Sequence, residues 1–266
     1  MSKLRFVKSA LILILLLFGG CAGPGSTSES DGANTSGTSE GTNESRNASD
    51  FTAILGSGNV VSESRNVSGF TEVALEGIGA LSIQQTGSES LTIEAEDNII
   101  PKIKTEVKDN RLTIGIEPNT SIQATKPITY KLTVKDLNAL ELSGSGRIDA
   151  QNINTNNLAV TNRGSGDVAA NDVDINDLKI AQRGSGEVKM SGKADTQDVN
   201  ISGSGSYQAE NLQSKEAKIV ANGSGEATIN ANNKLDVRIN GSGSVEYIGN
   251  PTITQRINGS GEVSRR

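Results

Sequence analysis

The chain has 266 residues, a formal net charge of −6, only 3% aromatic residues and no Trp. It contains no His and a single Cys, which excludes a histidine general base, an intrachain disulfide and a Cys or His metal cluster. An acidic chain with few rings also lacks the clustered Lys and Arg and the stacking platforms that nucleic-acid binding requires. Because compact globules of this size usually bury several aromatic side chains, the composition favours a thin aliphatic core.

Residues 1–20 have the pattern of an export signal. Three basic residues precede an unbroken apolar run, Ala10–Phe18, which is too short to cross a bilayer. Two Gly residues then lead into Cys21, which resembles the lipobox of prokaryotic lipoproteins, although Phe18 stands where Leu is usual. We therefore expect cleavage before Cys21 and a lipid on this residue that anchors the chain to the cell membrane or outer membrane, outside the cytoplasm. An uncleaved anchor and a cleaved, unlipidated signal are the alternatives.

Residues 21–50 are dominated by Ser, Thr, Gly, Asn and acidic residues, without apolar periodicity. Such a segment cannot bury enough apolar surface to offset the entropy lost on ordering. We expect a disordered tether that lifts the following domain off the membrane. With the three basic residues of the signal removed, 22 basic and 31 acidic residues remain, a net charge of −9.

Several Asn residues stand in the N-x-Ser/Thr pattern that accepts N-linked glycans in some exported proteins. They are Asn34, Asn43, Asn47, Asn66, Asn119, Asn200, Asn222, Asn240 and Asn258. Chance matches in a chain rich in Asn, Ser and Thr are the explanation we favour.

The tripeptide Gly-Ser-Gly recurs seven times after about residue 137, in steps of 18 to 20 residues. The copies are at 144–146, 164–166, 184–186, 203–205, 223–225, 241–243 and 259–261. Apolar residues stand four positions before each copy, except at Gln255, and again four positions after its first Gly. Apolar residues two apart share one face of a strand, and no coil of this length can bury that face alone. The sequence therefore predicts an all-β fold, a single-stranded β-helix (β-solenoid) of about twenty residues per coil, right-handed as parallel crossovers usually are.

The Gly-Ser-Gly tripeptides are best explained as corners between strands. A corner often requires a positive φ, which Gly adopts at little cost, and identical corners can stack closely. Asn222, Asn240 and Asn258 directly precede the last three copies and would form a side-chain ladder. A phosphate-binding loop is the alternative, but the following helix and Lys of such a loop are missing.

Residues 51–136 are less regular, with alternating apolar and polar residues in several short runs. Asp109-Asn110 is a good hairpin turn, and the tripeptides at 56–58 and 77–79 resemble the later corners. We interpret this segment as irregular, wider coils continuous with the regular coils of 137–266, so that 51–266 forms one β-helix domain. A separate β-sandwich is the alternative.

Three segments carry a resemblance to a known family. They are GSGNVVSESRNVSGFTEVALEG at 56–77, LTIEAEDNIIPKIKTEVKDNRLTIGI at 91–116 and YKLTVKDLNALELSGSG at 130–146, followed by the Gly-Ser-Gly coils. This order, over about residues 56–265, resembles the "putative auto-transporter adhesin, head GIN domain" family. The resemblance implies a right-handed β-helix on a cell-surface or periplasmic lipoprotein, and it brings no catalytic residues that could be transferred.

Two sets of charged residues are candidates for a site. The run from Asp172 to Asp177 has the D-x-D-x-N order of a calcium loop, but it lacks the Gly and the closing Glu of such loops, so a solvated strand face is the alternative we favour. Arg163 and Arg183 occupy one position in adjacent coils, as do Asp167 and Glu187. Such charges also line the walls of solenoid polysaccharide lyases and hydrolases.

The sequence therefore favours a non-enzymatic surface or envelope lipoprotein that displays a solenoid wall to glycans or envelope proteins. A polysaccharide-active enzyme and a self-assembling envelope protein, joined at coil edges, are the alternatives. Lipidation of Cys21 is the one site that we assign. We expect no catalytic, cofactor or metal residues and no nucleic-acid partner, and the membrane is contacted through the lipid.

Overall fold

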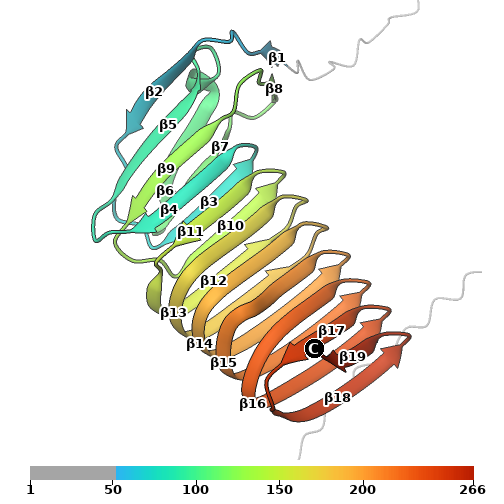
Figure 1. Cartoon of the computed structure of the whole chain (residues 1–266). Coiled ribbons are helices and arrows are strands. Elements are labelled where there is room, and N and C mark those ends of the chain that lie inside the picture. The colour runs from blue at the N-terminus through green and yellow to red at the C-terminus, as the bar shows by residue number, and fades with distance from the viewer. Residues whose placement is uncertain (1–51) are drawn as a thin grey trace, which may run out of the picture. The chain divides into compact units, whose positions relative to one another are not determined.

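The computed structural model describes residues 52–266, which form an elongated stack of strands (Figure 1). The predicted export signal, Cys21 and the tether lie outside the described residues. The described part is almost entirely β-structure, with one short 3-10 turn, η1 (Ile100–Lys102), and no α-helix. Within it no helix is long and apolar enough to span a membrane.

The strands before the regular coils are β1 (Thr52–Leu55), β2 (Val60–Arg65), β3 (Glu72–Gly77), β4 (Ala80–Gln85), β5 (Ser90–Glu96), β6 (Ile103–Lys108), β7 (Arg111–Ile116), β8 (Thr120–Gln123) and β9 (Thr129–Val134). Those that follow are β10 (Ala139–Gly144), β11 (Arg147–Gln151), β12 (Asn154–Asn162), β13 (Asp167–Gln182), β14 (Glu187–Gly203), β15 (Ser206–Gly223), β16 (Glu226–Gly241), β17 (Ser244–Ile248), β18 (Thr252–Gly259) and β19 (Glu262–Arg265).

The regular coils stack in parallel, each strand pairing with its copy in the next coil (Figure 1). The first half of β13 pairs with β11 and its second half with β12, so that one bent strand supplies most of a coil. β14, β15 and β16 continue the stack in the same way, and β17, β18 and β19 complete it. The predicted β-solenoid with coils of about twenty residues is confirmed.

The core lies inside the coils and is aliphatic. Six of the seven residues four positions before the corners are at most 3% exposed, and they are Leu140, Val160, Ile180, Val199, Ile219 and Val237. The seventh, Gln255, is exposed. Burying an aliphatic side chain of this size contributes roughly 1.5–3 kcal/mol. The alternation read from the sequence therefore identifies the inward face of each coil correctly.

The Gly-Ser-Gly tripeptides form stacked corners, as predicted. The first Gly of five copies has a φ between 124° and 136°, which an L side chain rarely adopts. A Cβ atom on Gly223 would also lie 2.7 Å from the backbone oxygen of Gly203 in the coil below. Gly is therefore required both by the backbone conformation and by the close approach of successive corners.

Differences in coil length are absorbed at a second corner, on the other side of each coil. The register between neighbouring coils shifts between Ala170 and Val173 and again between Ala209 and Gln213. Positive φ values occur here at Asn152 (56°), Asp172 (55°) and Gly192 (123°). This second corner lets coils of 18 to 20 residues keep the first corners aligned.

The segment before residue 137 joins the stack in an order that differs from the order of the chain. β3 and β4 form a layer directly on β10 and β11, and Gly77 lies under the corner of the next coil, accepting from the backbone N–H groups of Ser145 and Gly146. The chain then leaves this layer, and β7 and β9 return to pair with the other edges of β3 and β4.

Antiparallel pairs extend this end of the molecule. β5 lies between β2 and β9, and β6 forms a hairpin with β7. The predicted hairpin turn at Asp109 and Asn110 is confirmed, since both residues have the positive φ values, 50° and 64°, of a tight hairpin. β1 and β8 form a separate parallel pair.

The tripeptide at 56–58 is not a corner of the stack, and that part of the sequence interpretation is wrong. The Ser57 hydroxyl donates to Asp97, and the backbone N–H of Gly58 donates to Glu96 at 2.7 Å. This tripeptide is Gly-rich because it lies against a side chain: a Cβ on Gly56 would collide with the Glu96 carboxylate.

Candidate functional site

The run with the order of a calcium loop lies along β13, and its side chains do not converge. The Asp177 carboxylate accepts from the Thr196 hydroxyl of the next coil at 2.7 Å. The Asn176 amide donates to Asn156 of the preceding coil at 3.0 Å. Within residues 52–266, no group of three or more acidic, His or Cys residues could hold a metal ion. The run is therefore a strand face whose side chains bond across coils.

The stacked Arg and acidic residues also serve contacts between coils. The Arg163 guanidinium lies 2.9 Å from Glu141, and the same carboxylate lies 2.6 Å from Arg111. This ion network connects β7, β10 and the end of β12. On the other side of the corner, the Asp167 carboxylate accepts from the backbone N–H of Glu187 at 3.0 Å. Asp167 and Glu187 also lie near Arg147, whose guanidinium is 2.9 Å from Asp149.

The sequence gives no signal for the buried carboxylate of Glu96, which lies at the end of β5. It accepts from the backbone N–H groups of Thr125 (2.9 Å) and Gly58 (2.7 Å), and the Thr125 hydroxyl also donates to it. The Thr125 hydroxyl, followed by these N–H groups, holds the pKa of Glu96 below its usual range although burial opposes this. Glu96 thus connects the loop at Gly58 with the loop at Thr125.

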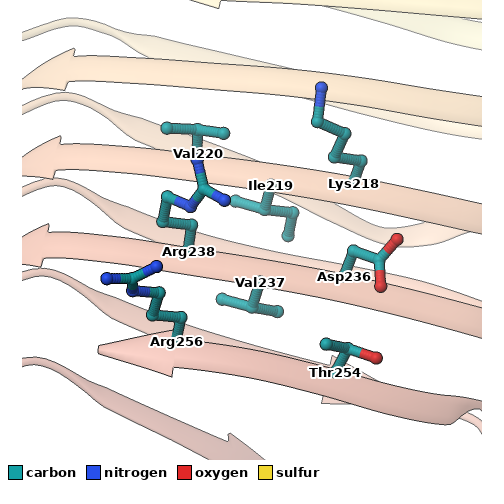
Figure 2. A pocket seen from close by; sticks show the side chains of 8 residues that line it. All are labelled: Lys218, Ile219, Val220, Asp236, Val237, Arg238, Thr254 and Arg256. Atoms are coloured by element: carbon teal, nitrogen blue, oxygen red, sulfur yellow. The ribbon is translucent and has the colours of Figure 1, made fainter. Parts of the chain in front are cut away.

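A regular surface forms a wall on the outer side of the C-terminal coils (Figure 2). We call it the outer wall; it comprises Lys218, Val220, Asn222, Asp236, Arg238, Asn240, Thr254, Arg256 and Asn258. These residues form three columns, because β15 pairs with β16 and β16 with β18 in constant register. Side chains of two columns surround a shallow depression of about 220 Å³.

The predicted Asn ladder forms one column of the outer wall. The Asn240 amide donates to Asn222 at 2.8 Å, and the Asn258 amide donates to Asn240 at 2.9 Å. Each donating amide nitrogen has a second hydrogen that the ladder does not use. The column therefore offers hydrogen-bond donors at the coil spacing of about 4.8 Å.

Charges alternate along the column that contains Lys218 and Asp236. Lys218 lies 3.6 Å from Asp198 of the preceding coil, and Lys234 lies 3.0 Å from Asp236. Figure 2 shows Arg238 and Arg256 one above the other, on the same strands as Asp236 and Thr254. The outer wall is thus a flat, polar surface with groups repeated from coil to coil, suited to contact with an extended partner rather than to enclosing a small molecule.

The chain can be compared with known proteins of similar sequence and fold. The family model described as "Putative auto-transporter adhesin, head GIN domain" matches residues 69–251, well over half of the chain. The chain belongs to this family. The resemblance noted from the sequence is confirmed. No curated protein matches the chain.

Solved structures of similar fold include proteins from Bacteroides and Parabacteroides species. A protein described as a putative adhesin from Bacteroides fragilis is 28% identical, with a TM-score of 0.77 over 80% of this chain and 100% of that one. A protein described as a putative lipid binding protein from Parabacteroides distasonis is 24% identical, with a TM-score of 0.69 over 81% of this chain and all of that one. A putative adhesin from the same species is 23% identical, with a TM-score of 0.63 over 80% and 100%. The last two show similarity of fold alone.

Proposed function

We propose that this chain is a non-enzymatic binding module of the cell surface or envelope that contacts glycans or envelope proteins through its solenoid wall. The observation that carries the proposal is the outer wall, where identical polar groups recur in register over successive coils. A repeated, shallow surface fits an extended partner with a repeating structure. Membership in a family described as adhesins supports the same reading.

The proposal includes export and attachment to a membrane through a lipid on Cys21. The apolar run followed by two small residues and a lone Cys supports this attachment. A single lipid chain gives only marginal membrane binding, so stable anchoring requires more than one acyl chain, as in lipoproteins. Residues 22–50 would then act as the tether between the lipid and the coils.

Self-assembly through a coil edge is a second candidate, favoured by one specific feature. Within the described residues β18 pairs with β16 on one side and with no strand on the other. Its Ile257, at the position where earlier coils have buried Ile239 and Ile201, is 37% exposed. An unpaired edge with exposed apolar side chains can pair with another strand.

A binding screen tests the proposed function directly. The full chain, purified in detergent, is applied to a glycan array and to immobilised envelope proteins. We expect selective retention of one glycan class or one envelope protein. Light scattering at several protein concentrations distinguishes the second candidate, because self-assembly raises the mean mass with concentration whereas a monomeric binder keeps it constant.

A further inference from the structure

The strongest unexplained feature of the outer wall is a pair of adjacent arginines. Arg238 of β16 and Arg256 of β18 are paired across the strands in direct register, and both point to the same side (Figure 2). Like charges directly opposite one another on a sheet are destabilising. Among the described residues, neither arginine forms an ion pair with a carboxylate. The two guanidinium groups therefore face solvent uncompensated.

The column of outward-facing residues that contains Arg238 and Arg256 also has a place where arginines are paired with acids. In constant register the column runs from Glu141 through Thr161, Ala181, Asn200 and Val220 to Arg238 and Arg256. At its first position Glu141 lies 2.6 Å from Arg111 and 2.9 Å from Arg163. The Glu141 carboxylate contacts both arginines, and Glu72 lies 3.7 Å from Arg111, so that two acids offset the two guanidinium charges. In the C-terminal coils the residue of this column next to Arg238 is Val220, which is not an acid.

The surrounding side chains leave the two arginines available. The acids on this side of β14 and β16 are paired with lysines, Asp198 with Lys218 and Asp236 with Lys234. On the other side stands the Asn ladder, whose donating amides each have a spare hydrogen. Between them Val220 and the aliphatic parts of the arginines line the shallow depression. The result is a local cationic strip on a chain with a net negative charge.

We infer that this strip binds an acidic glycan, a polysaccharide with carboxylate or sulfate groups, with Arg238 and Arg256 as its anion-binding residues. The inference rests on the proposed function and specifies its ligand. A guanidinium fork matches the two oxygens of a carboxylate or sulfate, and the Asn amides suit sugar hydroxyl groups. Consecutive coils repeat these groups at about 4.8 Å, which suits a repeating chain.

Other polyanions match the strip less well. Single-stranded nucleic acid is held by aromatic side chains on which its bases stack, and the outer wall has none. Anionic membranes attract clusters of four to eight basic residues, whereas the strip has two unpaired ones. An acidic peptide shares the carboxylate but lacks the hydroxyl groups that the Asn column would meet.

The test measures binding of the full chain to soluble probes by calorimetry. The probes are polygalacturonate (carboxylated), heparin (sulfated), dextran (neutral), polyglutamate and vesicles of anionic lipid. The double variant Arg238→Gln/Arg256→Gln removes the strip. Lys104→Gln/Lys108→Gln is the matched control, because it removes two exposed positive charges from β6. Arg238→Lys/Arg256→Lys keeps the charge and removes the planar forks.

We expect polygalacturonate or heparin to bind and dextran not to bind, with affinity falling as salt rises. The Gln double variant should bind about tenfold more weakly, the Lys double variant should be intermediate, and the β6 control should be unchanged. Binding of polygalacturonate assigns the carboxylate, and binding of heparin without polygalacturonate assigns the sulfate, because heparin carries both groups. No variant should melt below the wild type, because the substituted side chains are exposed, and the Gln double variant should melt slightly higher because it removes the repulsion between the two guanidinium groups.

Three results would overturn the inference. An equal loss of affinity in the β6 control would mean that only net charge matters. Unchanged affinity in the Gln double variant would place the glycan elsewhere and leave the proposed surface-binding function intact. Binding of polyglutamate or vesicles in preference to the two acidic glycans, or of no probe at all, would reject the acidic glycan as ligand; the broader array screen then decides the proposed function separately.

Discussion

At the scale of single residues, Gly is required for two separate reasons, the close stacking of corners and a positive φ. Two positions separate these reasons. Gly164 has no positive φ, but a Cβ there would collide with the backbone oxygen of Gly144. Gly87 has a φ of 79°, with no atom within 4 Å of a Cβ. The first position therefore tests stacking alone and the second tests backbone conformation alone.

Gly164→Ala should lower the free energy of unfolding by about 3 kcal/mol, since the backbones of stacked corners cannot separate without breaking the ladder. Gly87→Ala should lower it by about 1 kcal/mol, the cost of a left-handed conformation for an L residue. Urea unfolding of both variants measures the difference. Equal losses would show that the corners do not require close stacking.

The Glu96 carboxylate gives a pH-dependent prediction. Its pKa is lowered in the folded chain, so its contribution to stability is fully present above the ordinary value of 4.5 and is lost as the pH falls through the lower folded value. Glu96→Gln should therefore lower the Tm at neutral pH, and the difference from wild type should shrink below about pH 4.

The matched control for Glu96→Gln is Glu106→Gln, which changes an exposed carboxyl of β6. Its Tm should follow the wild type at every pH. Thermal melts from neutral pH to pH 3 measure both variants. A Tm difference for Glu96→Gln that stays constant over this range would contradict the role of the ionised carboxylate.

At the scale of elements, buried polar contacts connect neighbouring coils inside the aliphatic core. The Tyr207 hydroxyl of β15 donates to the Gln197 side chain of β14 at 2.7 Å, and both residues are buried. Burial raises the pKa of Tyr207 far above its usual value, so the hydroxyl stays protonated and remains a donor.

Tyr207→Phe should lower the free energy of unfolding by about 1–3 kcal/mol, because it leaves the Gln197 oxygen buried without a donor. Tyr247→Phe is the control, since that half-buried ring on β17 has no hydrogen-bond partner for its hydroxyl among the described residues. Denaturant unfolding compares the two. An equal or larger loss for Tyr247→Phe would mean that the hydrogen bond between Tyr207 and Gln197 adds no net stability.

The elements also show how far a sequence can be interpreted. The regular coils are predictable because each repeats the same short pattern, two inward-facing apolar residues followed by a Gly at the corner. Val199, Ile201 and Gly203 are one example. The layer formed by β3 and β4 is harder to place. Its neighbours on the two sides are β7 with β9 and β10 with β11, and no repeat in the sequence marks these long-range pairings.

The candidate site divides in the same way. The Asn ladder follows from identical residues at identical positions of the repeat, and the structure confirms it. Arg238 and Arg256 also occupy one position of the repeat, three residues before the first Gly of a corner, but only the structure shows that neither forms an ion pair with a carboxylate of residues 52–266. Glu96 gives no signal at all, since its partners, Gly58 and Thr125, are distant in the chain.

At the scale of the whole molecule, the proposed lipid on Cys21 should determine where the protein is located without affecting its fold. Cys21→Ser should release the chain from the membrane fraction, because the lipid would be its main hold on the bilayer. Detergent-phase partitioning of wild type and variant measures this, and the far-ultraviolet spectrum of the released variant should be unchanged. A variant that stays in the membrane fraction after detergent-free washing would contradict lipid anchoring at Cys21.

The central claim is that Arg238 and Arg256 on the wall of the solenoid bind an acidic glycan. The most direct measurement is retention of the full chain on a glycan array, compared with the variant Arg238→Gln/Arg256→Gln. The account predicts that the full chain is retained on spots bearing acidic glycans and that the variant is lost from those spots. Retention of both proteins at equal strength, or of neither on any spot, would contradict it.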